Sequence, residues 1–391
     1  MILIKNGLVK SMNGADIENG QVLIDGKKIV AVGKELKAEE GTQVIDAAGC
    51  IVCPGFIDAH CHISVHEEGM GREGADYNEI GDPVTPHLRG RDGINPRDKA
   101  LYEAAMAGVT TAVTGPGSAN SIGGTFLAIK TVGKTVDEMT IKDPIGMKCA
   151  FGENPKRVYG GRNKLPYNRM GNVQNIRECI IRAREYKKLK EAANGDFTKM
   201  PRYDAKLEAM QPVINKEIPL KAHCHRADDI QAAIRLAKEM DVNMTLDHCT
   251  EGYLIADEVA ASGFDAILGP NMIVRSKIEL RNASYDNYRI LNAAGVKIAI
   301  LTDHSVIPLR FLPICAGIAI KHGLPEEAAW KALTINPAEI TGIADRVGSL
   351  EPGKDADIAV FDGNPLRETT AHNLLTMISG EIVYKNENFK I

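Results

Sequence analysis

Five stretches of this chain read as β-strands, and each ends in a side chain of the kind that binds metal ions. The first is the clearest, because the apolar run from Pro54 to Ala59 leads into His60 and His62. Alternate residues of a strand share one face, so two histidines one residue apart point into the same cavity. The other four runs end at Glu153, His223, His248 and Asp303. One such histidine would be explained as structural, but the ordered set predicts strands whose carboxyl ends meet around a metal.

The middle of the chain predicts the architecture that brings these ends together. Between residues 54 and 344, apolar strand-like runs alternate with helical patterns, which is typical of parallel βα units. The runs end near His62, Thr114, Lys130, Glu153, His225, Cys249, Gly269 and His304. Eight of them predict an α/β fold, a (β/α)8 TIM-like barrel, with the active site at the carboxyl ends of the strands. Long connections over 64–95 and 154–172 are expected to form substrate walls or lids there.

The two ends of the chain share a different pattern of short strands and turns. Gln21–Ile24 and Lys28–Val32 flank an Asp-Gly turn, and similar short runs return after residue 345. Neither end can bury both of its faces alone. We therefore expect residues 1–53 and 345–391 to pair into one small β-sandwich domain beside a barrel domain of 54–344.

Charge and composition limit which classes of binding partner and which cellular compartment the sequence predicts. The 47 basic and 51 acidic residues give a net charge of −4 without a long block of like charge, so nothing favours nucleic acid or an anionic membrane. No signal-like segment and no run near the ~20 apolar residues of a membrane span is visible. A cytoplasmic protein with a small-molecule substrate follows, and a homo-oligomer is compatible with the sequence. The eight cysteines are expected to be reduced there.

Asp303 indicates what the metal would do. It ends an apolar run that starts at Lys297, and a carboxylate is costly to bury without a cation or a hydrogen-bond donor. A metal and its water supply both, so Asp303 is expected to bind metal and to act as a general base. Glu153 is the candidate from the fourth strand, although a salt bridge explains it almost as well. The sequence predicts a divalent metal, zinc first among the candidates, held by His60, His62, Glu153, His223, His248 and Asp303.

Two further groups are candidates for contacts with the substrate. His225 follows His223 by two residues, so either is the fifth-strand ligand, and His225 is also a catalytic candidate. Lys156, Arg157 and Arg162 cluster just after Glu153. Solvated surface charge is one interpretation of this cluster, and recognition of a substrate carboxylate or phosphate is the functional one.

Together these stretches resemble the amidohydrolase superfamily of metal-dependent hydrolases, close to its imidazolonepropionase-related branch. The matching stretches are Pro54–His62, His223, His248, Asp303, Asn336–Ala338 and Gly348–Asp357. The resemblance implies a barrel with a small β-sandwich, one or two divalent metals, and cleavage of an amide-like C–N bond by metal-activated water. The bond would be a non-peptide or cyclic amide.

The fourth strand departs from many relatives, which carry a carboxylated lysine bridging two metals. This sequence offers Glu153 at that strand end, as some relatives do. Lys130 and Lys148 lie on neighbouring strands, but Lys148 precedes Glu153 by five residues and is therefore expected to lie too deep to replace it. The metal number stays open.

Three other functions remain open within the same resemblance. A dipeptidase is one, and an aminohydrolase, or deaminase, is another. Deaminase relatives commonly carry a glutamate three residues after the fifth-strand histidine, where this chain has Arg226, which disfavours that activity. A catalytically silent scaffold would be the non-enzymatic alternative, but such relatives typically lose their metal ligands. We therefore expect an enzyme that acts on carbon-nitrogen bonds.

Overall fold

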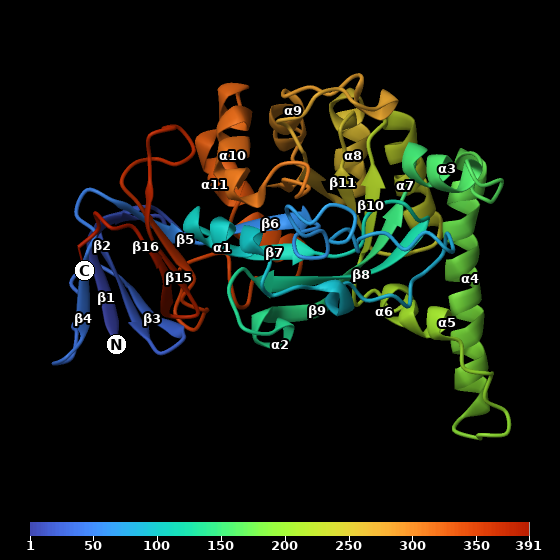
Figure 1. Cartoon of the computed structure of the whole chain (residues 1–391), viewed down its shortest axis with the longest axis horizontal. Coiled ribbons are helices and arrows are strands. Elements are labelled where there is room, and N and C mark those ends of the chain that lie inside the picture. The colour runs from blue at the N-terminus through green and yellow to red at the C-terminus, as the bar shows by residue number, and fades with distance from the viewer. Residues whose placement is uncertain (391) are drawn as a thin grey trace.

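The computed structural model describes residues 1–390 and contains two eight-stranded sheets. One sheet forms a nearly closed barrel in the middle of the molecule, and the other lies at one end, beside both chain termini (Figure 1). The barrel strands, in the order in which they pair, are β6 (Phe56–Cys61), β7 (Val109–Thr114), β8 (Ile122–Lys130), β9 (Thr140–Ala150), β10 (Leu220–Cys224), β11 (Met244–His248), β12 (Asp265–Leu268) and β13 (Ile298–Ile300). At the seam between β6 and β13, the backbone N–H of His62 donates to the carbonyl of His304 at 2.8 Å.

The third barrel strand corrects the expectation of a fully parallel barrel. Strand β8 is antiparallel to both β7 and β9, with Thr111 opposite Lys130 and Ile122 opposite Cys149. The connection from β7 to β8 spans only residues 115–121, whereas a parallel crossover needs roughly a dozen residues or more. Lys130 therefore lies at the opposite end of the barrel from the predicted metal ligands.

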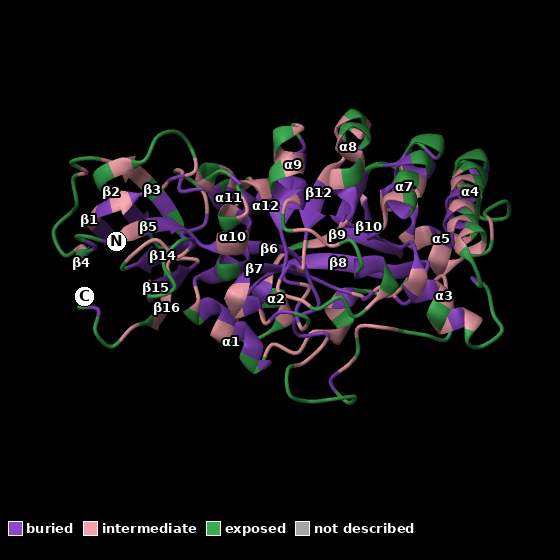
Figure 2. Ribbon diagram, turned by 90° about the horizontal axis from the view of Figure 1, so that it is seen from above, coloured by how far each residue is buried: buried purple, intermediate pink, exposed green. Residues whose placement is uncertain are grey.

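Helices surround the barrel and follow most of its parallel strands. They are α1 (Lys99–Met106), α2 (Val136–Met139), α3 (Glu153–Gly160), α4 (Arg169–Ala193), α5 (Ala205–Ala209), α6 (Gln211–Ile214), α7 (Ala227–Glu239), α8 (Ala256–Ser262), α9 (Asn287–Ala293), α10 (Leu312–Lys321), α11 (Glu326–Ala332) and α12 (Ile335–Ile340). Single 3-10 turns occur at η1 (Gly90–Gly93), η2 (Gly252–Ile255), η3 (Ile278–Leu280) and η4 (Leu309–Phe311). The barrel strands are buried and the outward helix faces are exposed, so the main core lies between the two layers (Figure 2). No helix within residues 1–390 is long and apolar enough to cross a membrane.

The second sheet is built from both ends of the chain, as the sequence predicts. Its strands are β1 (Ile2–Val9), β2 (Ile17–Asp25), β3 (Lys28–Gly33), β4 (Gln43–Asp46), β5 (Ile51–Pro54), β14 (Ile358–Phe361), β15 (Asn373–Ile378) and β16 (Glu381–Lys385). Strand β5 joins the ends, because it pairs with β1 on one side and with β14 on the other. Ile4, Val52, Ile358 and Leu375 belong to a core that this sheet encloses for itself. The limits of a separate domain at residues 53 and 345 remain a prediction.

A buried ion network connects the second sheet to the barrel. Because β8 is antiparallel, the ammonium of Lys130 reaches both Asp355, at 3.0 Å, and Asp357. Lys28 and Arg346 also bind the Asp355 carboxylate, at 2.8 and 2.7 Å. These aspartates lie in the Gly348–Asp357 stretch, so the structure assigns that motif an architectural role.

Candidate metal centre

The first group of ligand atoms comes from the first and last barrel strands. The Nε2 atom of His62 lies 3.3 Å from Oδ1 of Asp303, and Nε2 of His60 lies 3.7 Å from the same oxygen. The other ring nitrogen of each histidine is already engaged, since Nδ1 of His60 is 2.6 Å from Asp247 and Nδ1 of His62 is 2.8 Å from the Gly115 carbonyl. Such partners orient a ring so that its free nitrogen can bind metal.

The second group consists of His223, His225 and His248, from the fifth and sixth strands. One ring nitrogen of each lies within 4.8 Å of the others. His248 Nδ1 lies 2.9 Å from the Gly269 carbonyl, and His225 Nδ1 lies 2.7 Å from the Thr250 hydroxyl. The two groups adjoin, because the rings of His60 and His248 are 5.1 Å apart.

The protonation states of these groups suit metal binding. Burial lowers the pKa of His60, His223 and His225 well below the ordinary value, and it lowers the pKa of His248 to about 4. Burial alone would raise the pKa of Asp303, but the neighbouring histidines, His248 foremost, hold it well below its usual range. Neutral imidazoles and an ionised carboxylate are the forms that bind divalent cations. The donor set therefore fits a zinc-type metal.

Glu153 does not join either group of ligand atoms. Strand β9 ends at Ala150, and the chain then turns at Gly152, where φ is 83°, so that Glu153 becomes the first residue of α3. Its backbone N–H donates to the carboxylate of Glu279. The fourth strand contributes a different side chain at this site, because Nζ of Lys148 lies 3.1 Å from Nε2 of His60. The expectation that Lys148 lies too deep is therefore wrong.

Lys148 is fully buried, and its amine lies beside the first group, at His60. Burial lowers the pKa of its ammonium to about 8, with the Asp247 and Asp303 charges opposing the shift. A charged residue in the otherwise apolar run from Ile145 to Ala150 was the sequence signal for it.

Two buried aspartates that the sequence analysis gave no role hold the ligands in place. Besides His60, Asp247 contacts Lys221 at 3.2 Å and accepts from the Thr245 hydroxyl at 2.7 Å. Burial would raise its pKa, but Lys221 and His60 keep the carboxyl ionised. Asp58 accepts from the backbone N–H groups of His60 and Thr302, at 2.9 Å each, and so ties the first strand to the segment that carries Asp303.

The predicted substrate cations lie outside the ligand groups. Arg157 is exposed, and its Nη2 lies 3.5 Å from the Asn154 amide oxygen. Asn154 is buried and contacts Nε2 of His223 at 3.4 Å, so Arg157 is one side chain away from the site. Arg162 is exposed and donates to the Ile80 carbonyl at 2.6 Å, and Lys156 is half-buried on the same helix.

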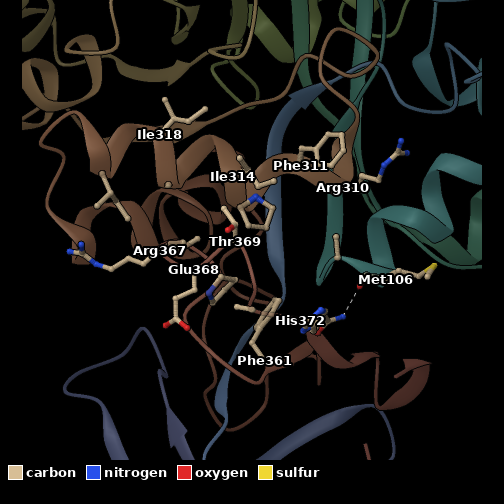
Figure 3. A pocket seen from close by; sticks show the side chains of 18 of the residues that line it. Met106, Arg310, Phe311, Ile314, Ile318, Phe361, Arg367, Glu368, Thr369 and His372 are labelled. Atoms are coloured by element: carbon tan, nitrogen blue, oxygen red, sulfur yellow. Dashed lines mark hydrogen bonds between the residues drawn. The ribbon is translucent and has the colours of Figure 1, made fainter. Parts of the chain in front are cut away.

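Two cavities differ in their relation to the metal ligands. A cavity of about 360 Å³, called here the His248 pocket, is lined by His248, Thr250, Asn271, Arg275 and Tyr285 among others. A larger groove of about 1080 Å³ lies between α1, α10 and the loop after β14, and none of the predicted site residues lines it (Figure 3). Its lining includes Met106, Ile314 and Phe361. Of these two cavities, only the smaller is lined by one of the predicted metal ligands, His248.

Comparisons with known proteins point to one family. The model of the Amidohydrolase family matches residues 51–388. The crystal structure of an amidohydrolase from Thermotoga maritima MSB8 is 40% identical, with 99% of this chain and 100% of that chain covered and a TM-score of 0.95. Imidazolonepropionase of Geobacillus kaustophilus (strain HTA426) is 29% identical over 88% of this chain and 84% of its own length. Amidohydrolase tasK of Hapsidospora irregularis is 28% identical over 89% of this chain, which spans 38% of that longer protein.

Proposed function

Because the chain belongs to the amidohydrolase family, we propose that it is a metal-dependent hydrolase of an amide-like C–N bond. The observation that carries this proposal is the convergence of two groups of ligand atoms at the carboxyl ends of the barrel strands, with Lys148 beside the first group. The substrate we propose is a small non-peptide or cyclic amide. Relatives named imidazolonepropionase make a cyclic amide the first type to test.

Two divalent ions fit the residues of the site, and we propose zinc. His60, His62 and Asp303 would hold one ion, and His223 and His248 the other, with His225 as a further ligand or a substrate contact. After carboxylation, in which its neutral amine adds to carbon dioxide and releases a proton, Lys148 would serve as a ligand to both ions. When bound, the ions supply Lewis acidity, which polarises a carbonyl and makes water acidic near neutral pH.

Proton transfer falls to Asp303. Its carboxylate lies at the edge of the first ligand group, 3.3 Å from His62, and is partly accessible. It would take the proton that the attacking water loses and deliver it to the leaving nitrogen, which then departs as a neutral amine. His225 belongs to the second group, where Thr250 orients its ring, and would contact the substrate from that side.

The competing activities differ in observable products. A dipeptidase would release two amino acids, and an aminohydrolase would release ammonia. At position 226, where a deaminase would need a carboxylate to shuttle protons, this chain has an arginine. Arg226 forms an ion pair with Asp228 at 2.9 Å. All eight cysteines are free and buried, which supports the cytoplasm as the proposed compartment.

Elemental analysis tests the proposal first. His60→Ala and His62→Ala should lose metal with the fold retained, as judged by circular dichroism, because each removes a ligand atom of the first group. His372→Ala is the matched control, since His372 is exposed just before strand β15 of the second sheet and belongs to neither group of ligand atoms. Full metal occupancy in both site variants would show that the assignment is wrong. A screen of cyclic amides, N-acyl compounds and dipeptides, with ammonia release measured in parallel, then tests the reaction.

A further inference from the structure

The His248 pocket differs in charge from the metal centre that it adjoins. Among its lining residues within the described chain, none is an aspartate or a glutamate, and Arg275 is a cation of the lining. Its walls include the rings of Tyr285 and Tyr288, and the Tyr285 ring stacks on His322 with centroids 4.6 Å apart. The pocket is thus lined by neutral and positively charged side chains. Two of its lining residues, His248 and Thr250, also belong to the metal centre or contact it.

The guanidinium of Arg275, which lines this pocket, has donors available to bind a ligand. Within residues 1–390, Arg275 forms no ion pair with a carboxylate, and its one side-chain hydrogen bond goes from Nη2 to the Ala283 carbonyl at 3.2 Å. The guanidinium carries five N–H donors, so most of them remain available. A free guanidinium at the mouth of a pocket that holds no acid is suited to an anionic group, which it can bind with two parallel hydrogen bonds.

We propose that the His248 pocket binds an anionic group of a small amide substrate, and that Arg275 determines this specificity. The inference rests on the proposed hydrolase function and adds the class of substrate to it. A volume of about 360 Å³ suits a compact molecule. The segment between β12 and α9, rather than the cations at 156, 157 and 162, would then select the substrate.

The test compares matched substrates on the metal-loaded protein. A panel of N-acyl amino acids and carboxylate-bearing cyclic amides is assayed beside the corresponding carboxamides, for hydrolysis and for binding by calorimetry. Phosphonate analogues show whether the preferred anion is a carboxylate or a phosphate-like group. Arg275→Met removes the cation, and Arg281→Met is the control, since Arg281 is exposed on the same segment and does not line the pocket.

We expect the anionic compounds to exceed their carboxamides by about tenfold or more in kcat/KM, mainly through KM, because the ion pair acts on binding. Arg275→Met should remove most of this preference by lowering kcat/KM for the anionic compounds, whereas Arg281→Met should keep the preference. Hydrolysis without any preference for an anion would overturn the inference but leave the proposed function intact. Binding of anions that depends on Arg275, without hydrolysis of any compound, would support the inference about the pocket and contradict the proposed hydrolase function. Failure of every anionic compound to bind would also overturn it.

Discussion

At the scale of single residues, Lys148 is the fourth-strand side chain that reaches the candidate metal ligands. Its amine contacts His60 at 3.1 Å, and burial lowers its pKa from 10.5 to about 8. Carboxylation needs the neutral amine, so loading of metal-free protein with bicarbonate and zinc should accelerate from pH 7 toward pH 8 and level off above it.

Lys148→Met should bind less metal than the parent, and the carbamate signal seen by ¹³C NMR with labelled bicarbonate should be absent. Loss of the bridge should abolish most of the turnover of any substrate found. Lys142→Met is the control, because Lys142 lies on the same strand but is exposed and binds the Gly342 carbonyl. Full metal content without a carbamate signal in the parent would contradict the bridging role.

Asp303 is the second residue whose role can be tested by one substitution. Asp303→Asn keeps the shape of the side chain but cannot carry the proton between water and the leaving nitrogen. Turnover should fall by about 10²-fold or more, with much of the metal retained. Steady-state kinetics and elemental analysis on the same preparation would check both results. Turnover at the parental rate would rule out Asp303 as the base.

At the scale of secondary-structure elements, the reversed strand β8 has a structural consequence at the far end of the barrel. It places Lys130, which is 3% exposed, against Asp355 and Asp357. Removing one member of a buried ionic network leaves the partner charges uncompensated, which typically costs 3–5 kcal/mol.

Lys130→Met should therefore lower the free energy of unfolding by about 3 kcal/mol, measured by urea denaturation. Lys134→Met, at an exposed position just after the strand, should change it little. The double variant Lys130→Met/Asp357→Leu should recover part of the lost free energy of unfolding, since it also removes one of the carboxylates that lose their counter-ion. Equal stability of the Lys130 and Lys134 variants would contradict a stabilising role of the network.

At the scale of the whole molecule, the second sheet depends on both ends of the chain. Strands β1 to β4 lie within the first 50 residues, and β1 pairs with β5, which in turn pairs with β14. A chain lacking residues 1–50 would expose the apolar faces of Ile358 and Leu375, which the first strands now cover.

The segment from Val347 to Lys390 should then become sensitive to protease, while the barrel strands stay protected for longer. Limited proteolysis followed by mass spectrometry would locate the cleavage sites in the truncated and the full chain. A truncated protein that folds independently with this segment still protected would show that the two ends do not depend on each other.

The sequence by itself determined the strand ends that carry His60, His62, His223, His248 and Asp303, and the pairing of the two chain ends. These are local signals, because an apolar run and the two-residue alternation of a strand are visible in a few consecutive positions. The resemblance to one family followed from the same stretches.

Only the tertiary structure decided which fourth-strand side chain reaches the metal centre and which way the third strand runs. Strand β9 ends before Gly152, so Glu153 leaves the barrel, while the long side chain of Lys148 reaches the site from within the strand. The direction of β8 depends on its short connection and on its neighbours on both sides. Residue spacing along the chain cannot report these distances, because they arise when segments remote in sequence pack side by side.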